Sequence, residues 1–80
     1  MSDPVKAVVE VIARALVDHP DAVKVTENER RGLKVYSLTT APGDMGKIIG
    51  RQGRTAAALR TLVAATAERD GMRVTLEIRD

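Results

Sequence analysis

The stretch DMGKIIGRQGRT, residues 44–55, contains the pattern that decides how the rest of this sequence is interpreted. It opens on Asp44, whose side chain can cap a short helix over residues 45–49. Gly50 and Gly53 follow a short apolar run, and glycine, which lacks a Cβ atom, permits a tight reversal of the chain and the close approach of another backbone. The pattern therefore predicts a short helix, a glycine loop and a second helix that begins at Arg54.

The charges around this glycine loop favour a polyanionic ligand. A helix that begins at Arg54 presents unpaired N–H groups and the positive end of its dipole beside the loop, an arrangement that binds phosphate. No acidic residue lies between Asp44 and Glu68. The same stretch holds four cations: Lys47, Arg51, Arg54 and Arg60. Because the formal net charge of the chain is only +2, the positive field is concentrated near the loop.

The N-terminal part of the chain predicts an amphipathic helix over residues 4–18. Its apolar side chains are spaced by three and four and so share one face: Val5, Val8, Val9, Ile12 and Leu16. Asp3 is placed to cap this helix, with Pro4 at the first helical position, where a missing N–H costs nothing. Pro20 ends the helix, because the residue before a proline is pushed out of the α region.

Two strands and a polar turn are predicted next. Residues 22–27 alternate between apolar and polar side chains, residues 28–32 are polar and end in glycine, and residues 33–40 form the return strand of a hairpin. The alternation does not decide which face of the return strand is buried. Pro42 and Gly43 then break the strand.

A second helix and a last strand complete the chain. The helix runs over residues 54–69 and carries one apolar face: Ala56, Leu59, Leu62, Val63 and Thr66. Residues 72–78 alternate as a strand, with Val74, Leu76 and Ile78 pointing inward. Arg73 and Arg79 are expected to be solvated on the outer face of the sheet.

The element order α-β-β-α-α-β predicts an α+β fold. The first two strands form an antiparallel hairpin, and the last strand returns parallel to the second through the two-helix crossover. The result is a three-stranded mixed sheet with helices on one face. Eighty residues suffice for one domain, so we expect residues 1–80 to form a single domain.

The run IIGRQG, residues 48–53, resembles the signature of the KH domain, in which a GXXG loop holds the backbone of about four nucleotides. The element order is similar to that of type II KH domains. The resemblance covers essentially the whole chain and extends to the small bacterial RNA-binding proteins of the KhpA type, which consist of one KH domain. Its most specific part is the pattern D-x-G-x-x-I-G-R-x-G-R-T over residues 44–55.

This resemblance implies roles for eight consecutive residues at the RNA site: Lys47, Ile48, Ile49, Gly50, Arg51, Gln52, Gly53 and Arg54. The two glycines would shape the loop, while Arg51 and Gln52 would contact RNA phosphates. Lys47 and Arg54 would add charge from the flanking helices, and one of the two isoleucines would line the apolar groove where bases lie. Ala56 stands where KH domains often carry a larger aliphatic residue, which predicts a shallower groove.

Protein pairing is the alternative function. The helix over residues 54–69 carries a ridge of mostly small side chains roughly opposite its apolar face: Ala57, Thr61, Ala64, Ala65 and Glu68. Alanine can be there only because it favours helix, or because small side chains let a second helix approach. The resemblance implies a homodimer or a pair with a larger KH-containing protein. The chain is then either an RNA chaperone or regulator that binds single-stranded RNA, or a pairing scaffold with weak RNA binding.

Several function classes are disfavoured. The chain has no cysteine, and His19 has no second metal ligand at useful spacing, so neither a metal nor another cofactor is expected. No nucleophile stands beside a base, which argues against an enzyme. The single aromatic residue, Tyr36, argues against recognition by base stacking on a sheet. No signal peptide or membrane-spanning run is recognisable, so we expect a cytoplasmic protein without membrane insertion.

Overall fold

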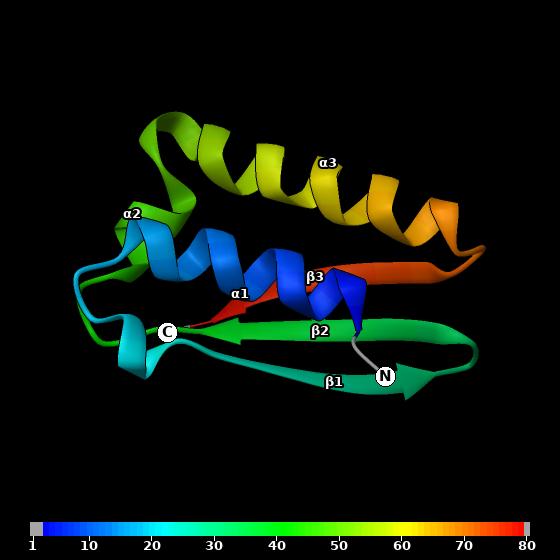
Figure 1. The fold of residues 1–80 in the computed structure, drawn as a ribbon. Coiled ribbons are helices and arrows are strands. Elements are labelled where there is room, and N and C mark those ends of the chain that lie inside the picture. Colours follow the sequence, from blue (N-terminus) through cyan, green and yellow to red (C-terminus); the bar gives the residue numbers. More distant parts are fainter. Residues whose placement is uncertain (1–2, 80) are drawn as a thin grey trace.

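The computed structural model describes residues 3–79, and its elements follow the predicted order α-β-β-α-α-β, with two single 3-10 turns added (Figure 1). In chain order the elements are α1 (Pro4–Leu16), η1 (Pro20–Ala22), β1 (Lys24–Arg30), β2 (Leu33–Thr39), α2 (Met45–Ile49), η2 (Arg51–Gly53), α3 (Arg54–Arg69) and β3 (Arg73–Arg79). None of the helices in this part of the chain is long and apolar enough to cross a bilayer.

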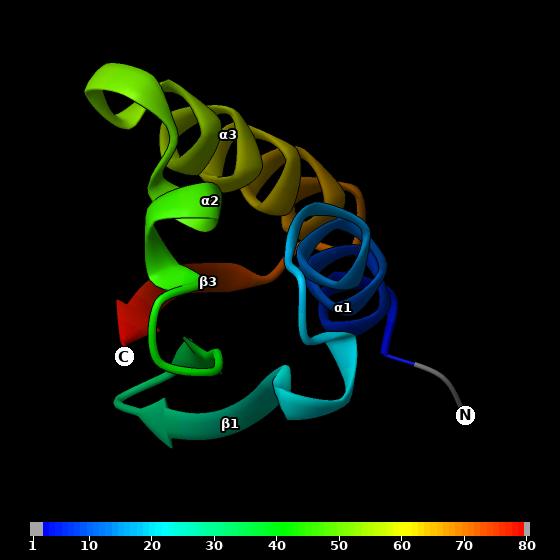
Figure 2. The ribbon, with the colours of Figure 1, turned by 90° about the vertical axis from the view of Figure 1, so that its left-hand side faces the viewer.

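The three strands form one mixed sheet in the order β1-β2-β3. Strands β1 and β2 are antiparallel, while β2 and β3 are parallel and pair from Leu33 opposite Arg73 to Thr39 opposite Arg79. Figures 1 and 2 show α1, α2 and α3 on the same side of the sheet, with α1 and α3 running roughly along the strands and α2 at one end. The predicted α+β fold class, strand pairing and one-sided covering are confirmed.

The core lies between the sheet and the helices. Its fully buried large side chains are Tyr36, Leu38, Ile48, Leu59, Val5, Val9 and Val63. Tyr36 and Leu38 are two residues apart in β2 and therefore share the face that the helices cover, which settles the face that the sequence left open. Leu76 is buried, and Val74 and Ile78 pack against the core, so the predicted inward face of β3 is confirmed.

The start of α1 is fixed by Asp3. One carboxylate oxygen of Asp3 accepts hydrogen bonds from the backbone N–H groups of Val5 at 3.1 Å and Lys6 at 3.2 Å. The other oxygen accepts the hydroxyl proton of Tyr36 at 2.8 Å. The predicted cap is confirmed, and it also satisfies the polar end of a core tyrosine. Burial raises the pKa of the Asp3 carboxyl, but the Tyr36 hydroxyl and the Lys6 N–H outweigh it and hold the pKa below its ordinary value.

The helix faces differ in detail from the predicted stripes. Leu16 on α1 and Leu62 on α3 were expected inside but are 38% and 48% exposed. The buried side chains instead recur mostly every four residues: Val5, Val9, Ala13 and Val17 at α1, and Ala56, Leu59, Val63 and Ala67 on α3. Alanine occupies inward positions where the larger leucines fall at the flank, because the helical phase sets the face irrespective of side-chain size.

The hairpin turn is shorter than expected. Strand β1 continues to Arg30, so residues 28–30 belong to the strand and only Arg31 and Gly32 form the turn. Both turn residues have positive φ, 50° at Arg31 and 82° at Gly32, the backbone of a two-residue type I′ turn. A type I′ turn matches the twist of paired strands. The sequence did not indicate this turn, because its first position holds arginine, where asparagine is usual.

Candidate nucleic-acid interface

The approach to the glycine loop begins at Asp44. Asp44 occupies the N-cap position of α2, as predicted, but within residues 3–79 its side chain makes no capping hydrogen bond to that helix. Its Oδ2 instead accepts the backbone N–H of His19 at 3.0 Å, and the His19 ring nitrogen Nδ1 lies 3.2 Å from the same oxygen. The predicted side-chain cap is therefore wrong, because a partner 25 residues earlier in the chain takes the carboxylate.

The loop itself is a sharp reversal between α2 and α3. The Gly50 N–H donates to the Gly46 carbonyl at 2.9 Å and ends α2, and the Gly53 N–H donates to the Gly50 carbonyl at 3.1 Å. Positive φ angles occur at three of its four residues: 74° at Gly50, 56° at Gln52 and 73° at Gly53. The left-handed backbone at Gln52 turns the chain so that α3 can begin at once.

The two glycines are required for different reasons. A Cβ atom at Gly50 would lie 2.6 Å from the Cβ of Thr55 and 3.0 Å from its backbone nitrogen, so a side chain there collides with the first turn of α3. A Cβ at Gly53 would meet no described atom within 4 Å, and only the positive φ favours glycine there. Gly50 therefore brings the loop into close contact with α3, and Gly53 leaves open space above it.

The polar side chains of the loop are free to meet a ligand. Arg51, Gln52 and Arg54 are exposed. Neither arginine forms an ion pair with any residue between positions 3 and 79. Two guanidinium groups without an ion-pair partner in residues 3–79 therefore lie at the N-terminus of a helix of 16 residues, one within the glycine turn and one directly after it. Such a site favours an anion.

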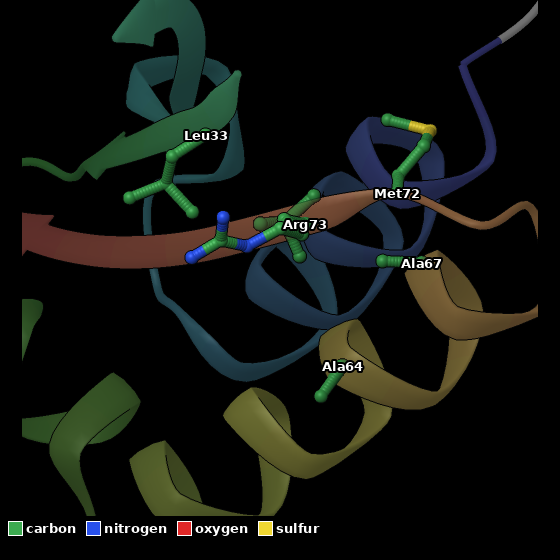
Figure 3. Close-up of a pocket in the computed structure, with 6 residues that line it drawn as sticks. Leu33, Ala64, Ala67, Met72 and Arg73 are labelled. Atoms are coloured by element: carbon green, nitrogen blue, oxygen red, sulfur yellow. The ribbon is translucent and has the colours of Figure 1, made fainter. Parts of the chain in front are cut away.

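An open groove lies between α3 and β3. Two adjoining depressions form it and share Ala64 and Val74. The nearer depression, toward the start of α3, is lined by Arg60, Val63, Ala64, Val74, Thr75 and Leu76. The further depression, toward the end of α3, is lined by Leu33, Ala64, Ala67, Met72, Arg73 and Val74. Figure 3 shows Leu33 and Arg73 on the strand side of the further depression, with Ala64 and Ala67 on the α3 side. Most of the lining side chains are apolar, and each depression also contains one arginine, Arg60 in the nearer and Arg73 in the further.

Comparison with known proteins assigns the family. A family model described as the KH domain of KhpA and KhpB matches residues 6–78. The chain belongs to this KH-domain family. The RNA-binding protein KhpA of Halalkalibacterium halodurans is 52% identical over 75 residues, which are 94% of this chain and 99% of that protein. The protein of the same name from Aquifex aeolicus is 48% identical over 73 residues, 91% of this chain and 92% of its own length.

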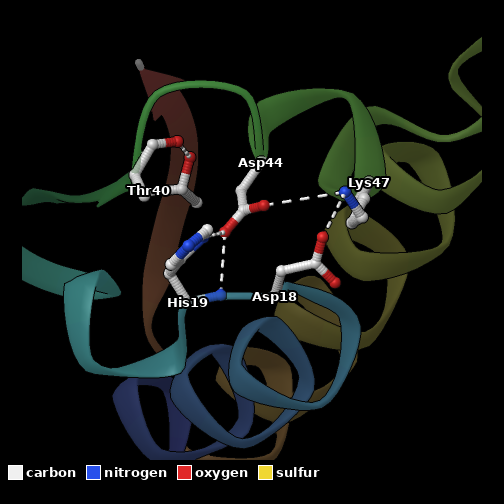
Figure 4. Close-up of polar contacts among 6 residues, drawn as sticks. Asp18, His19, Thr40, Asp44 and Lys47 are labelled. Atoms are coloured by element: carbon white, nitrogen blue, oxygen red, sulfur yellow. Dashed lines mark hydrogen bonds and ion pairs between the residues drawn. The ribbon is translucent and has the colours of Figure 1, made fainter.

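The KH domain does not bring all eight predicted site residues to one surface. Arg51, Gln52 and Arg54 project at the loop, and Ile49 is 36% exposed beside them. Ile48 is fully buried and packs in the core, so of the two isoleucines only Ile49 can line an open groove. The Lys47 ammonium is directed elsewhere: its Nζ lies 3.1 Å from Asp18 Oδ2 and 3.6 Å from Asp44 Oδ1 (Figure 4).

The groove of this KH domain adds two residues that the sequence alone did not place at the site. Arg60 was recognised as a nearby cation, and in the structure its Nε donates to the Leu76 carbonyl of the edge strand β3 at 3.4 Å. Arg73 is exposed, as expected, and also lines the groove at the start of β3. The available signal was the parallel return of β3, which places this strand beside α3.

The predicted pairing ridge is open to solvent in this KH domain. All five of its residues are exposed: Ala57, Thr61, Ala64, Ala65 and Glu68. Ala64 also lines the groove, so the ridge and the groove share a border. The larger exposed apolar side chains Val11 and Leu62 lie on the same two helices that cover the sheet. Pairing through this surface stays a prediction.

Proposed function

We propose that this KH domain binds short single-stranded RNA and holds its backbone on the loop of residues 50–53. The observation that carries this proposal is a pair of exposed arginines, Arg51 within the glycine loop and Arg54 directly after it, which have no acidic partner among the described residues. Relatives that match nearly the whole chain are named RNA-binding proteins, which supports the same ligand.

The loop supplies the phosphate contacts. The open space above Gly53 lets a sugar-phosphate backbone approach the chain closely. The N-terminus of α3 directs the positive end of its helix dipole toward that phosphate. Arg51 and Arg54 add full charges, and the Gln52 amide adds neutral donors. These contacts position the strand and carry no sequence preference.

The groove between α3 and β3 receives the bases. Its lining is mostly aliphatic, with Val63, Ala64, Val74 and Leu76 contributing the surface. Strand β3 is an edge of the sheet, so one row of its backbone N–H and C=O groups is available to base edges. Aliphatic contact gives less energy than aromatic stacking, and affinity from one domain is therefore modest.

The protein then acts as a cytoplasmic RNA chaperone or regulator, with pairing as the remedy for modest affinity. A homodimer, or a pair with a larger KH-containing protein, would present two loops to one RNA and raise the effective affinity without a new contact. The exposed Val11 and Leu62 support pairing as a second candidate function, in which RNA binding is weak. Ala65→Glu should lower the dimer fraction measured by light scattering if the ridge pairs, because a charge would be buried there.

The test is binding to a pool of short single-stranded RNAs at two salt concentrations. The variant Arg51→Asp, Gln52→Asp should lose binding, because it places two carboxylates against phosphate. Arg30→Asp, Asn28→Asp on the exposed strand β1 is the matched control: it makes the same change in net charge away from the loop and should retain binding. Equal binding by both variants, with folding verified by circular dichroism, would contradict the proposal.

A further inference from the structure

Helix α2 is too short to fix its own direction. It contains five residues, little more than one turn, and isolated helices of that length are unstable in water. The loop of residues 50–53 follows α2 directly, so its position depends on what holds α2 from outside. Ile48 anchors one side of α2 in the core. Charged side chains attach the first turn of α2 to the rest of the protein.

Asp44 provides that attachment. Its side chain is only 3% exposed, and a carboxylate removed from water must be paired and hydrogen-bonded. The backbone N–H of His19 and its ring nitrogen both meet Oδ2, which joins the segment after α1 to the start of α2 (Figure 4). Burial raises the pKa of the Asp44 carboxyl, but the two His19 contacts outweigh it, so the pKa lies below its ordinary value and the group is charged at neutral pH.

Lys47 completes the same arrangement one turn along α2. Figure 4 shows its ammonium directed at two carboxylates, Asp44 at the N-cap position of α2 and Asp18 beyond the end of α1. The contact with Asp18, followed by the charge of Asp44, raises the pKa of the Lys47 ammonium. A cation held between two carboxylates has its field cancelled at short range, so Lys47 contributes little positive potential to the loop.

We propose that Asp18, His19, Asp44 and Lys47, here called the Asp44 cluster, position the loop for RNA, and that Lys47 makes no phosphate contact. The inference rests on the proposed function for its binding readout. Asp44 is the central positioning residue, because its carboxylate contacts both His19, after α1, and Lys47, on α2. When the cluster is broken, α2 and the loop sample other directions, and only the fraction in the bound geometry can hold RNA.

Salt dependence separates a positioning residue from a phosphate contact. Each phosphate neutralised on a single strand contributes about −0.7 to the slope of log affinity against log salt. Lys47→Met and Asp44→Asn should each raise the dissociation constant roughly three- to tenfold and leave this slope unchanged. Arg51→Met should reduce the magnitude of the slope by about 0.7. The double variant should be no weaker than the more affected single variant, because both changes break one cluster.

Lys34→Met is the matched control for charge. Lys34 is also in an ion pair, 3.5 Å from Glu27, but it lies near the hairpin end of β2, and its loss should leave RNA affinity unchanged. Amide hydrogen exchange of the free protein gives a readout that needs no RNA. The Gly50 and Gly53 amides, both hydrogen-bonded within this segment, should exchange about fivefold faster or more in the Lys47 and Asp44 variants, with amides of β2 unaffected.

Two results would overturn the inference: a slope reduced by about 0.7 in Lys47→Met, which would make Lys47 a phosphate contact, or unchanged exchange at Gly50 and Gly53. If Asp44→Asn fails to fold, Lys47→Met alone decides through the same two measurements. If the wild type binds no RNA, the proposed function fails, while the exchange measurement still tests whether the Asp44 cluster positions the loop.

Discussion

The starts of α1 and α2 both carry an aspartate at the N-cap position, and the two carboxylates do different things. Asp3 accepts hydrogen bonds from the first turn of its own helix and from the core residue Tyr36. Asp44 makes no capping bond to α2 among the described residues and accepts the His19 N–H instead. The same residue type at the same position therefore stabilises a helix in one place and joins two distant segments in the other.

The difference follows from helix length. Helix α1 has 13 residues and a buried apolar face, so a local cap and core packing suffice to hold it. Helix α2 has five residues and carries a binding loop, so its direction has to be fixed by contacts from other parts of the chain. Disturbing Asp3 should therefore cost global stability, whereas disturbing Asp44 should mainly affect the loop.

The largest effect is expected for Asp3→Ala. It removes the α1 cap and leaves the Tyr36 hydroxyl without its partner, so the free energy of unfolding should fall by about 2–3 kcal/mol. Chemical denaturation measures this loss, and the folded protein should keep its RNA affinity. Asp3→Ser, which retains a capping oxygen, should lose less. A loss below about 0.5 kcal/mol for Asp3→Ala would remove one side of the comparison.

Gly50→Ala should come next, because it affects the loop through both collision and backbone strain. The new Cβ would press on Thr55, and the φ of 74° with ψ of 173° lies in a region that only glycine occupies readily, so we expect a loss of about 2 kcal/mol. Gly53→Ala has open space and should lose about 1 kcal/mol. Thermal unfolding compares the two. A larger loss at Gly53 would contradict the packing at Thr55.

Tyr36→Phe tests the Asp3 side through pH. Burial, and then the Asp3 carboxylate, raise the pKa of the Tyr36 phenol well above its ordinary value of about 10. Above about pH 10 the unfolded chain releases the phenolic proton while the folded chain keeps it. The contribution of Tyr36 to the free energy of unfolding is therefore complete below about pH 10 and falls as the pH rises further. Tyr36→Phe should lose about 1 kcal/mol at neutral pH and show a weaker alkaline decline in denaturant titrations. An identical alkaline decline in both proteins would contradict this.

The smallest effect is expected for His19→Ala. The variant removes the ring nitrogen contact but keeps the backbone N–H that donates to Asp44 at 3.0 Å, so stability should change by less than about 0.5 kcal/mol. RNA affinity should change less than in Asp44→Asn. An effect as large as that of Asp44→Asn would mean that the imidazole, rather than the backbone, joins the two segments.

Much of the fold follows from sequence because its signals are local. The Asp3 cap, the glycines and the alternation of β3 lie within a few residues of the structure they determine, and the bounds predicted for α3 match those observed. The predicted apolar faces are wrong at Leu16 and Leu62, because the spacing of apolar residues alone does not fix the angle at which a helix packs on the sheet. The length of the hairpin turn was predicted wrongly, because Arg31 adopts a backbone with positive φ that arginine seldom takes.

The candidate site was predicted where its chemistry is local and missed where it depends on packing. The loop could be found from its glycines and charges. The burial of Ile48 beside the exposed Ile49, and the attachment of Asp44 to His19, depend on how distant segments pack. The α3–β3 groove depends on the crossover that places β3 beside α3, which the topology implied but no single residue indicated.

The most direct test of the account is a titration of the ¹⁵N-labelled protein with short single-stranded RNA, followed by the amide shifts in NMR spectra. We predict the largest changes at residues 49–54, smaller ones along the groove at Arg60, Val74 and Arg73, and almost none on α1. Changes centred on α1 or on β1, with the loop amides unmoved, would contradict the claim that the glycine loop holds the RNA backbone.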